Sequence, residues 1–284
     1  MPNQVVVPVG DDGRVKLYNS SGDTAHLIAD VFGYYSAEPS GAAFTAVAPS
    51  RLLDTRAAVG RPGTDPVPAF GEVTLQVAGR AGVPQTGVRA VVLNVTVTEP
   101  KADGHLTVWP SGGERPDSSN LNWTAGLTVP NHVVVPVGAD GRVKLFNAAG
   151  DTTHLIADVF GYYSDDPAAA TFHSAGPKRM FDTRTTGAVA PGASTTLDLS
   201  GSRDLAHAKA VVLNVTVTEP TDAGHLTVWP SGTARPDASN LNWTQGRTVA
   251  NLVTVPVGAD GKVEFANRSG GSTQVIVDLL GYFG

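Results

Sequence analysis

A segment of 35 residues occurs three times in this chain, and this repeat constrains the fold more than any other feature. It covers residues 2–36, 130–164 and 250–284, and the first two copies are identical at 29 of those 35 positions. The second and third copies each end a longer repeated unit, whereas the first copy follows Met1 alone. A repeat of this kind predicts a tandem array of similar modules, not one large domain.

Two longer units share one ordered series of motifs. The shared motifs are DTR, AVVLNVTVTEP, GHLTVWPSG and SNLNW, followed by the 35-residue segment. Short linkers rich in Ala, Asp, Ser and Pro separate the units, and such composition is typical of domain boundaries. We therefore predict a partial repeat at 1–36, a complete unit at 44–164 and a second complete unit at 172–284.

The residue pattern within each unit is that of β-strands. VVLNVTVT and HLTVW alternate apolar with polar residues, which places the two kinds on opposite faces of a strand. Asp-Gly pairs between apolar runs favour tight hairpin turns. About eight short strands in about 120 residues is the size of a two-sheet sandwich. The predicted fold class is all-β, with tandem antiparallel β-sandwich units of jelly-roll or immunoglobulin-like topology, two of them complete and one partial.

The composition excludes several kinds of function. The net charge is −6 with both signs mixed, so we expect no nucleic-acid partner. No apolar run is long enough to span a bilayer, so we expect no membrane insertion. Cysteine is absent, and the Asp-rich turns lack the spacing of a calcium loop, so we predict no metal and no cofactor. No catalytic motif is recognisable, and we expect that the protein is not an enzyme.

The series RLLDTR, LNVTVT, LTVWPSG and GYY resembles a tandem β-sandwich repeat module of secreted and cell-surface proteins in actinobacteria. The resemblance covers nearly the whole chain. It implies a non-catalytic accessory module that is extracellular or attached to the cell surface, and it assigns no ligand. The chain differs from that pattern in having no signal peptide after Met1.

A face containing tryptophan is the candidate ligand site. Strand alternation puts Trp109, Thr107 and His105 on one face, and we expect the preceding strand to place Asn94 and Thr96 beside them. Aromatic and short polar side chains on a flat face are typical of sugar-binding platforms. Coverage of the tryptophan by a loop or by the neighbouring unit is the alternative. The equivalent set in the second unit is Trp229, Thr227, His225, Asn214 and Thr216.

Charged residues in the apolar strands predict a structural ion network. Asp158 lies in the run LIADVF and needs a partner if it is buried. Arg56, which shares a strand face with Asp54 in the DTR motif, is the predicted partner. The second unit repeats this set as Asp182, Arg184 and Asp278. Asp30 is the equivalent of Asp158 in the partial repeat, where no DTR segment precedes it.

The partial repeat leaves three arrangements open. It can borrow partner strands from another chain, it can pack with residues 44–128 in place of 130–164, or it can be the remnant of a longer array. Two functions follow: an adhesion module that binds cell-wall or other glycans, or a structural subunit of a surface fibre that self-associates through residues 2–36.

Overall fold

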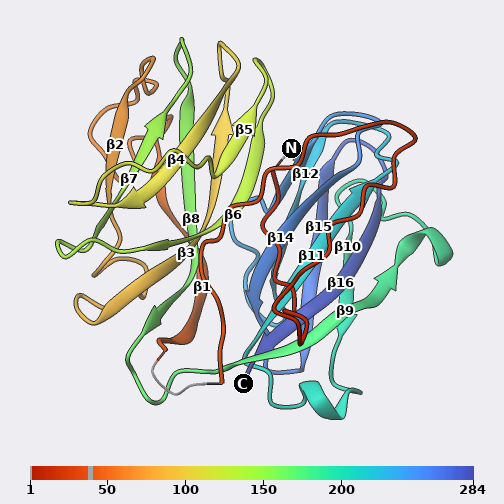
Figure 1. Cartoon of the computed structure of the whole chain (residues 1–284). Coiled ribbons are helices and arrows are strands. Elements are labelled where there is room, and N and C mark those ends of the chain that lie inside the picture. The colour runs from red at the N-terminus through yellow and green to blue at the C-terminus, as the bar shows by residue number, and fades with distance from the viewer. Residues whose placement is uncertain (1, 38–40) are drawn as a thin grey trace.

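The computed structural model describes residues 2–37 and 41–284 and contains four antiparallel, four-stranded sheets (Figure 1). The sheets form two β-sandwiches that lie side by side, one built from β1–β8 and the other from β9–β16. The prediction of an all-β protein with tandem sandwich units is confirmed.

The first sandwich is an eight-stranded jelly roll. Its strands are β1 (Ala43–Asp54), β2 (Glu72–Gln76), β3 (Val88–Thr98), β4 (Gly104–Pro110), β5 (Leu121–Trp123), β6 (Val129–Pro136), β7 (Arg142–Asn147) and β8 (His154–Ser164). They form sheets in the orders β1-β8-β3-β6 and β2-β7-β4-β5. Consecutive strands mostly alternate between the two sheets, which is the jelly-roll arrangement and not the immunoglobulin one.

The second sandwich repeats this topology. Its strands are β9 (Phe172–Asp182), β10 (Ser194–Asp198), β11 (Ala210–Thr218), β12 (Gly224–Pro230), β13 (Leu241–Trp243), β14 (Val249–Pro256), β15 (Lys262–Ser269) and β16 (Gln274–Phe283). The sheet orders are β9-β16-β11-β14 and β10-β15-β12-β13, and two short 3-10 helices occupy Thr183–Thr185 and Arg203–Leu205.

Each sandwich has its own apolar core. In β3 the alternation predicted from the sequence holds, because Val91, Leu93 and Val95 point inward and are fully buried. Burial of each such side chain stabilises the fold by about 1.5–3 kcal/mol.

A third apolar cluster joins the two sandwiches. It lies between the outer faces of the sheets that contain β3 and β11, and its largest members are Phe44, Phe160, Leu252 and Phe283. Both sheets are therefore covered on two sides, which explains why β8 and β16 are apolar on both faces.

Residues 2–37 form no strand, and the jelly-roll topology explains this. They correspond to β6, β7 and β8, and in a complete unit these three strands pair only with β1–β5. The segment therefore contains no two strands that can pair with each other. It nevertheless keeps the turns of a unit: the Gly10 amide donates to the Arg14 carbonyl at 3.0 Å, as Gly138 does to Arg142 at 2.9 Å.

Candidate functional site: the interface between repeats

The predicted tryptophan platform is wrong. Strand β4 pairs with β5 and β7, whereas β3 lies in the opposite sheet, so Asn94 and Thr96 are not beside Trp109. Trp109 is only 4% exposed, and its Nε1 donates to the Gly113 carbonyl at 3.2 Å. The equivalent Trp229 is 7% exposed. The alternative of a covered tryptophan describes both positions, and neither ring offers a free face to a sugar.

The other residues of the predicted face also do not lie together on one exposed surface. Thr107 and Thr227 are buried and donate to backbone carbonyls of the loop that precedes β5 or β13. Thr216 and His105 are half-buried in their own units. His225 lines the groove between the two units, where burial and then the charge of Arg268 lower its pKa.

An ion network is present, but its predicted pairing is wrong. Arg51, not Arg56, binds Asp158, with Nε 2.7 Å from a carboxylate oxygen. Arg51 also binds Asp54 at 3.0 Å, while the ion pair of Arg56 is with Asp54, at 2.9 Å. Burial raises the pKa of Asp158 despite Arg51. Burial would also raise the pKa of Asp54, but hydrogen bonds from Arg56 outweigh it and hold that pKa below its usual value.

The second unit repeats the corrected network. Arg179 binds Asp278 at 2.5 Å and Asp182 at 2.9 Å, and Arg184 also binds Asp182. Hydrogen bonds from Arg184 lower the pKa of Asp182 to about 2. Asp30, the equivalent of Asp158 in the partial repeat, is exposed to solvent, so its predicted place in a buried ion network is wrong.

Asn251 on β14 joins the two units by two hydrogen bonds. Its Nδ2 donates to Asn94 Oδ1 at 3.0 Å, and its Oδ1 accepts from the His132 backbone amide at 3.1 Å. The Asn94 Nδ2 donates in turn to the Ser239 carbonyl at 2.7 Å. Asn94 and Asn251 are almost completely buried, so both amides are satisfied across the interface and not by solvent.

The partial repeat binds the second unit through the same pair of hydrogen bonds. Asn3 is the equivalent of Asn251, and its Nδ2 donates to Asn214 Oδ1 at 3.0 Å. Its Oδ1 accepts from the Leu252 backbone amide, also at 3.0 Å. Asn214 and Leu252 are the equivalents of Asn94 and His132. The partial repeat is therefore docked on unit two as unit two is docked on unit one.

Aromatic contacts repeat in the same way. Phe283 of the second unit packs on Phe44 of the first, with ring centroids 4.2 Å apart. Tyr35 of the partial repeat stacks on Phe172 of the second unit at 4.1 Å. Tyr35 is the equivalent of Phe283, and Phe172 of Phe44, so the second contact is a copy of the first.

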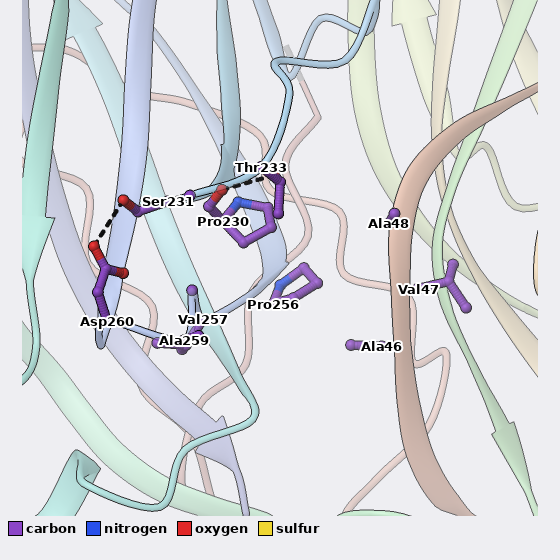
Figure 2. Close-up of a pocket in the computed structure, with 12 residues that line it drawn as sticks. Ala46, Val47, Ala48, Pro230, Ser231, Thr233, Pro256, Val257, Ala259 and Asp260 are labelled. Atoms are coloured by element: carbon purple, nitrogen blue, oxygen red, sulfur yellow. Dashed lines mark hydrogen bonds between the residues drawn. The ribbon is translucent and has the colours of Figure 1, made fainter.

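Two hollows lie along the boundary between the units. One, of about 470 Å³, separates Ala46–Ala48 of β1 from Pro230 and Pro256 of the second unit (Figure 2). The other, of about 540 Å³, is a polar groove lined by Arg51, Thr96 and residues of both units. Thr96 lines this groove, and its Oγ1 is buried and has no hydrogen-bond partner among the residues described.

Comparison with known proteins leaves the family open. No family model matches the chain, and no curated protein matches it. The solved structures that are similar to the chain include three that are matched over at least 90% of their own length. The first is the N-terminal CBM22-1-CBM22-2 tandem domain of Xyn10C from Paenibacillus barcinonensis, with 12% identity, a TM-score of 0.24, and coverage of 85% of this chain and 100% of that one. The second is the STIV MCP, with 7% identity, a TM-score of 0.23, and coverage of 84% and 96%. The third is a putative secreted protein from Parabacteroides distasonis, with 8% identity, a TM-score of 0.21, and coverage of 86% and 90%. Similarity at this level carries no argument about ligand or activity. No helix within the described ranges is long and apolar enough to cross a membrane.

Proposed function

We propose that this chain is a non-catalytic structural protein of the cell exterior, in which jelly-roll modules are held in a fixed head-to-tail order. The observation that carries this proposal is the pair of hydrogen bonds made by Asn251 and made again by Asn3. Equivalent residues repeat one contact between different pairs of modules. The joint is therefore a property of the repeat and not an accident of one boundary.

The joint is heterologous, because each module uses one surface to bind the module before it and another to bind the module after it. Such contacts generate rings when the rotation closes and filaments when it does not, so the joint determines how the modules are arranged. The buried polar groups at the joint are paired with each other, which fixes the relative orientation of the modules. Placement outside the cell rests on the motif series shared with surface repeat modules.

A matched pair of variants tests the joint. Asn251 and Asn131 are equivalent, and each donates to a backbone carbonyl of its own unit, at 2.7 and 2.5 Å. Only Asn251 also bonds across the boundary to Asn94 and His132. We expect Asn251→Ala to lower the free energy of unfolding by about 1–3 kcal/mol more than Asn131→Ala, because it leaves buried partners unpaired.

Small-angle X-ray scattering supplies the second readout. Asn251→Ala is expected to increase the radius of gyration, because it loosens a joint that the apolar cluster around Phe44 and Phe283 then holds without these hydrogen bonds, while Asn131→Ala leaves it unchanged. Equal losses of stability and unchanged scattering for both variants would contradict a specific joint between the modules.

Binding of a glycan in the polar groove is the second candidate function. The observation that favours it is that Thr96 lines the groove and has a hydroxyl with no hydrogen-bond partner among the described residues, so a sugar hydroxyl that displaces the side chains over it would satisfy this group. Thr96→Val removes the hydroxyl at nearly constant volume, and Thr216→Val makes the same change at the equivalent position. Loss of binding to a cell-wall glycan array with Thr96→Val alone would support the groove, and binding that both variants retain would exclude it.

A further inference from the structure

Three equivalent aromatic residues surround one point of the structure. Tyr35, Tyr163 and Phe283 close the three copies of the repeated segment, and their ring centroids are 6.4, 6.0 and 6.2 Å apart. Each joint relates one module to the next by a rotation. The third module contacts the first only if three such rotations return to the starting orientation. The near-equal distances therefore mark a pseudo-threefold axis, and the partial repeat occupies the third position around it.

His132 shows that the partial repeat contacts the first unit as well as the second. Its ring nitrogens lie 2.7 Å from Gln4 Oε1 and 3.1 Å from Thr254 Oγ1. Gln4 is the equivalent of His132 itself, so equivalent positions of two copies meet directly. Contacts of this kind are expected close to a rotation axis.

The third joint, between the partial repeat and unit one, is only half formed. Asn131 would have the role there that Asn251 and Asn3 have at the other two joints. Its Oδ1 is buried and has no hydrogen-bond partner among the described residues. Its Nδ2 bonds only within its own unit, to the Asn120 carbonyl. The residue that would receive Asn131 is the counterpart of Asn94, and the partial repeat has no such residue.

The second joint also lacks part of its contacts. Arg51 donates to the Asp237 carbonyl, which belongs to the loop between β12 and β13 of the following module. The partial repeat has no counterpart of that loop. Accordingly the side chains of Arg179 and Asp278 are 48% and 22% exposed, against 23% and 1% for Arg51 and Asp158.

The surface that this leaves open is apolar and has the pattern of a jelly-roll core. Side chains of the partial repeat that are core residues at the equivalent positions of unit one are exposed here. They are Val5, Val7, Val15, Leu17, Leu27 and Val31. In unit one, strands β1–β5 cover the equivalent side chains. A segment with the same strands would therefore fit this exposed surface.

We propose that residues 2–36 are the docking site for a polypeptide with the sequence pattern of residues 44–128, which adds five strands, completes a third jelly roll and closes a ring of three modules. This proposal rests on the proposed function. A folded second copy of this chain does not offer such a segment, because its own residues 44–128 are already paired with 129–164. The occupant is therefore an unpaired five-strand segment of this repeat type.

A grafted chain tests this proposal. Residues 43–129 are placed directly before Pro2, in the position they have before Pro130. Hydrogen exchange by mass spectrometry then follows the backbone amides of residues 2–36 in the grafted and the original chain. We expect exchange of these amides to slow by at least about 100-fold in the graft, because each strand gains its ladder partners.

Gly33→Ala provides a matched control. Gly33 has open space around its Cα, whereas a Cβ at the equivalent Gly161 would lie 2.3 Å from the Phe44 ring. Gly33→Ala is therefore expected to leave the Tm of the original chain unchanged. In the graft it should lower the Tm by several degrees, because the grafted copy of Phe44 would then occupy that space.

The outcomes separate this proposal from the one it rests on. Unchanged exchange of residues 2–36 in the graft, or a neutral Gly33→Ala in the graft, would overturn the ring while the joint measured with Asn251→Ala could still stand. Oligomers of the original chain that grow with concentration and protect residues 2–36 would overturn the choice of occupant, since a second copy would then fill the site.

Discussion

The buried histidine between the modules makes the stability of this protein depend on pH. His132 lies among Gln4, Thr254 and the Asn251 side chain, and burial lowers its pKa to about 3. In the unfolded chain the imidazole has an ordinary pKa of about 6.5. Between these two values the unfolded state binds a proton that the folded state does not, so stability is complete above pH 6.5 and falls as the pH decreases.

The magnitude follows from the two pKa values. Between pH 7 and pH 5 the unfolded state gains about 2 kcal/mol from protonation of this one imidazole, while the folded state gains almost nothing. For a protein of this size the loss corresponds to roughly 4–8 °C in Tm. Protonation that only separates the two modules would have the same sign, since it also requires His132 to reach water.

The variant His132→Leu isolates this contribution. Leucine occupies the equivalent position 252 and is buried there, so the side chain suits the site. Differential scanning calorimetry at pH 7 and pH 5 compares the wild type with the variant, and carboxylates and other histidines contribute equally to both. We expect the wild type to lose about 2 kcal/mol more than the variant. An equal loss in both proteins would refute the assignment of a neutral, buried His132.

Two further predictions use equivalent positions as internal controls. Arg51→Ala is expected to lower the free energy of unfolding, measured by urea titration, by about 3–5 kcal/mol, because it leaves the buried Asp158 unpaired. Arg179→Ala should lower it by no more than about 1 kcal/mol, because the equivalent network is more exposed. Equal losses would contradict the role of burial. Gly161→Ala should lower the Tm strongly, because its Cβ would overlap the Phe44 ring, while Gly33→Ala should not change it. A neutral Gly161→Ala would show that β8 and β1 pack more loosely than described.

The fold class could be predicted from the sequence because alternation of apolar and polar residues is a local signal. It correctly assigns the inward face of β3, where Val91, Leu93 and Val95 are buried. The prediction of the tryptophan platform was wrong because it assumed that β3 and β4 are neighbours in one sheet. Neighbours in the sequence, β3 and β4, lie in opposite sheets, and no local pattern carries that information.

The ion network shows the same limit at the level of strand register. Sequence patterns identified Asp158 as a buried charge that needs an arginine, and this is correct. Irregular pairing of β1 with β8 then brings Arg51 opposite Asp158, while Arg56 lies beyond the end of β1. The asparagine joint was missed altogether, although Asn3, Asn131 and Asn251 are invariant among the three copies of the segment. Identity of a polar residue in all copies was the one signal that could have indicated it.

The strand order of each jelly roll also sets when it can form during synthesis. Strand β8 lies between β1 and β3, so the sheet that contains them stays open until the last residues of the unit have left the ribosome. Pairing over such long sequence separations is slow, and it leaves apolar strands exposed to aggregation in the meantime. Residues 2–36 are made before Tyr163, Phe172 and Phe283, against which Tyr35 packs. The contacts of residues 2–36 with the second unit can therefore form only after that unit has been synthesised.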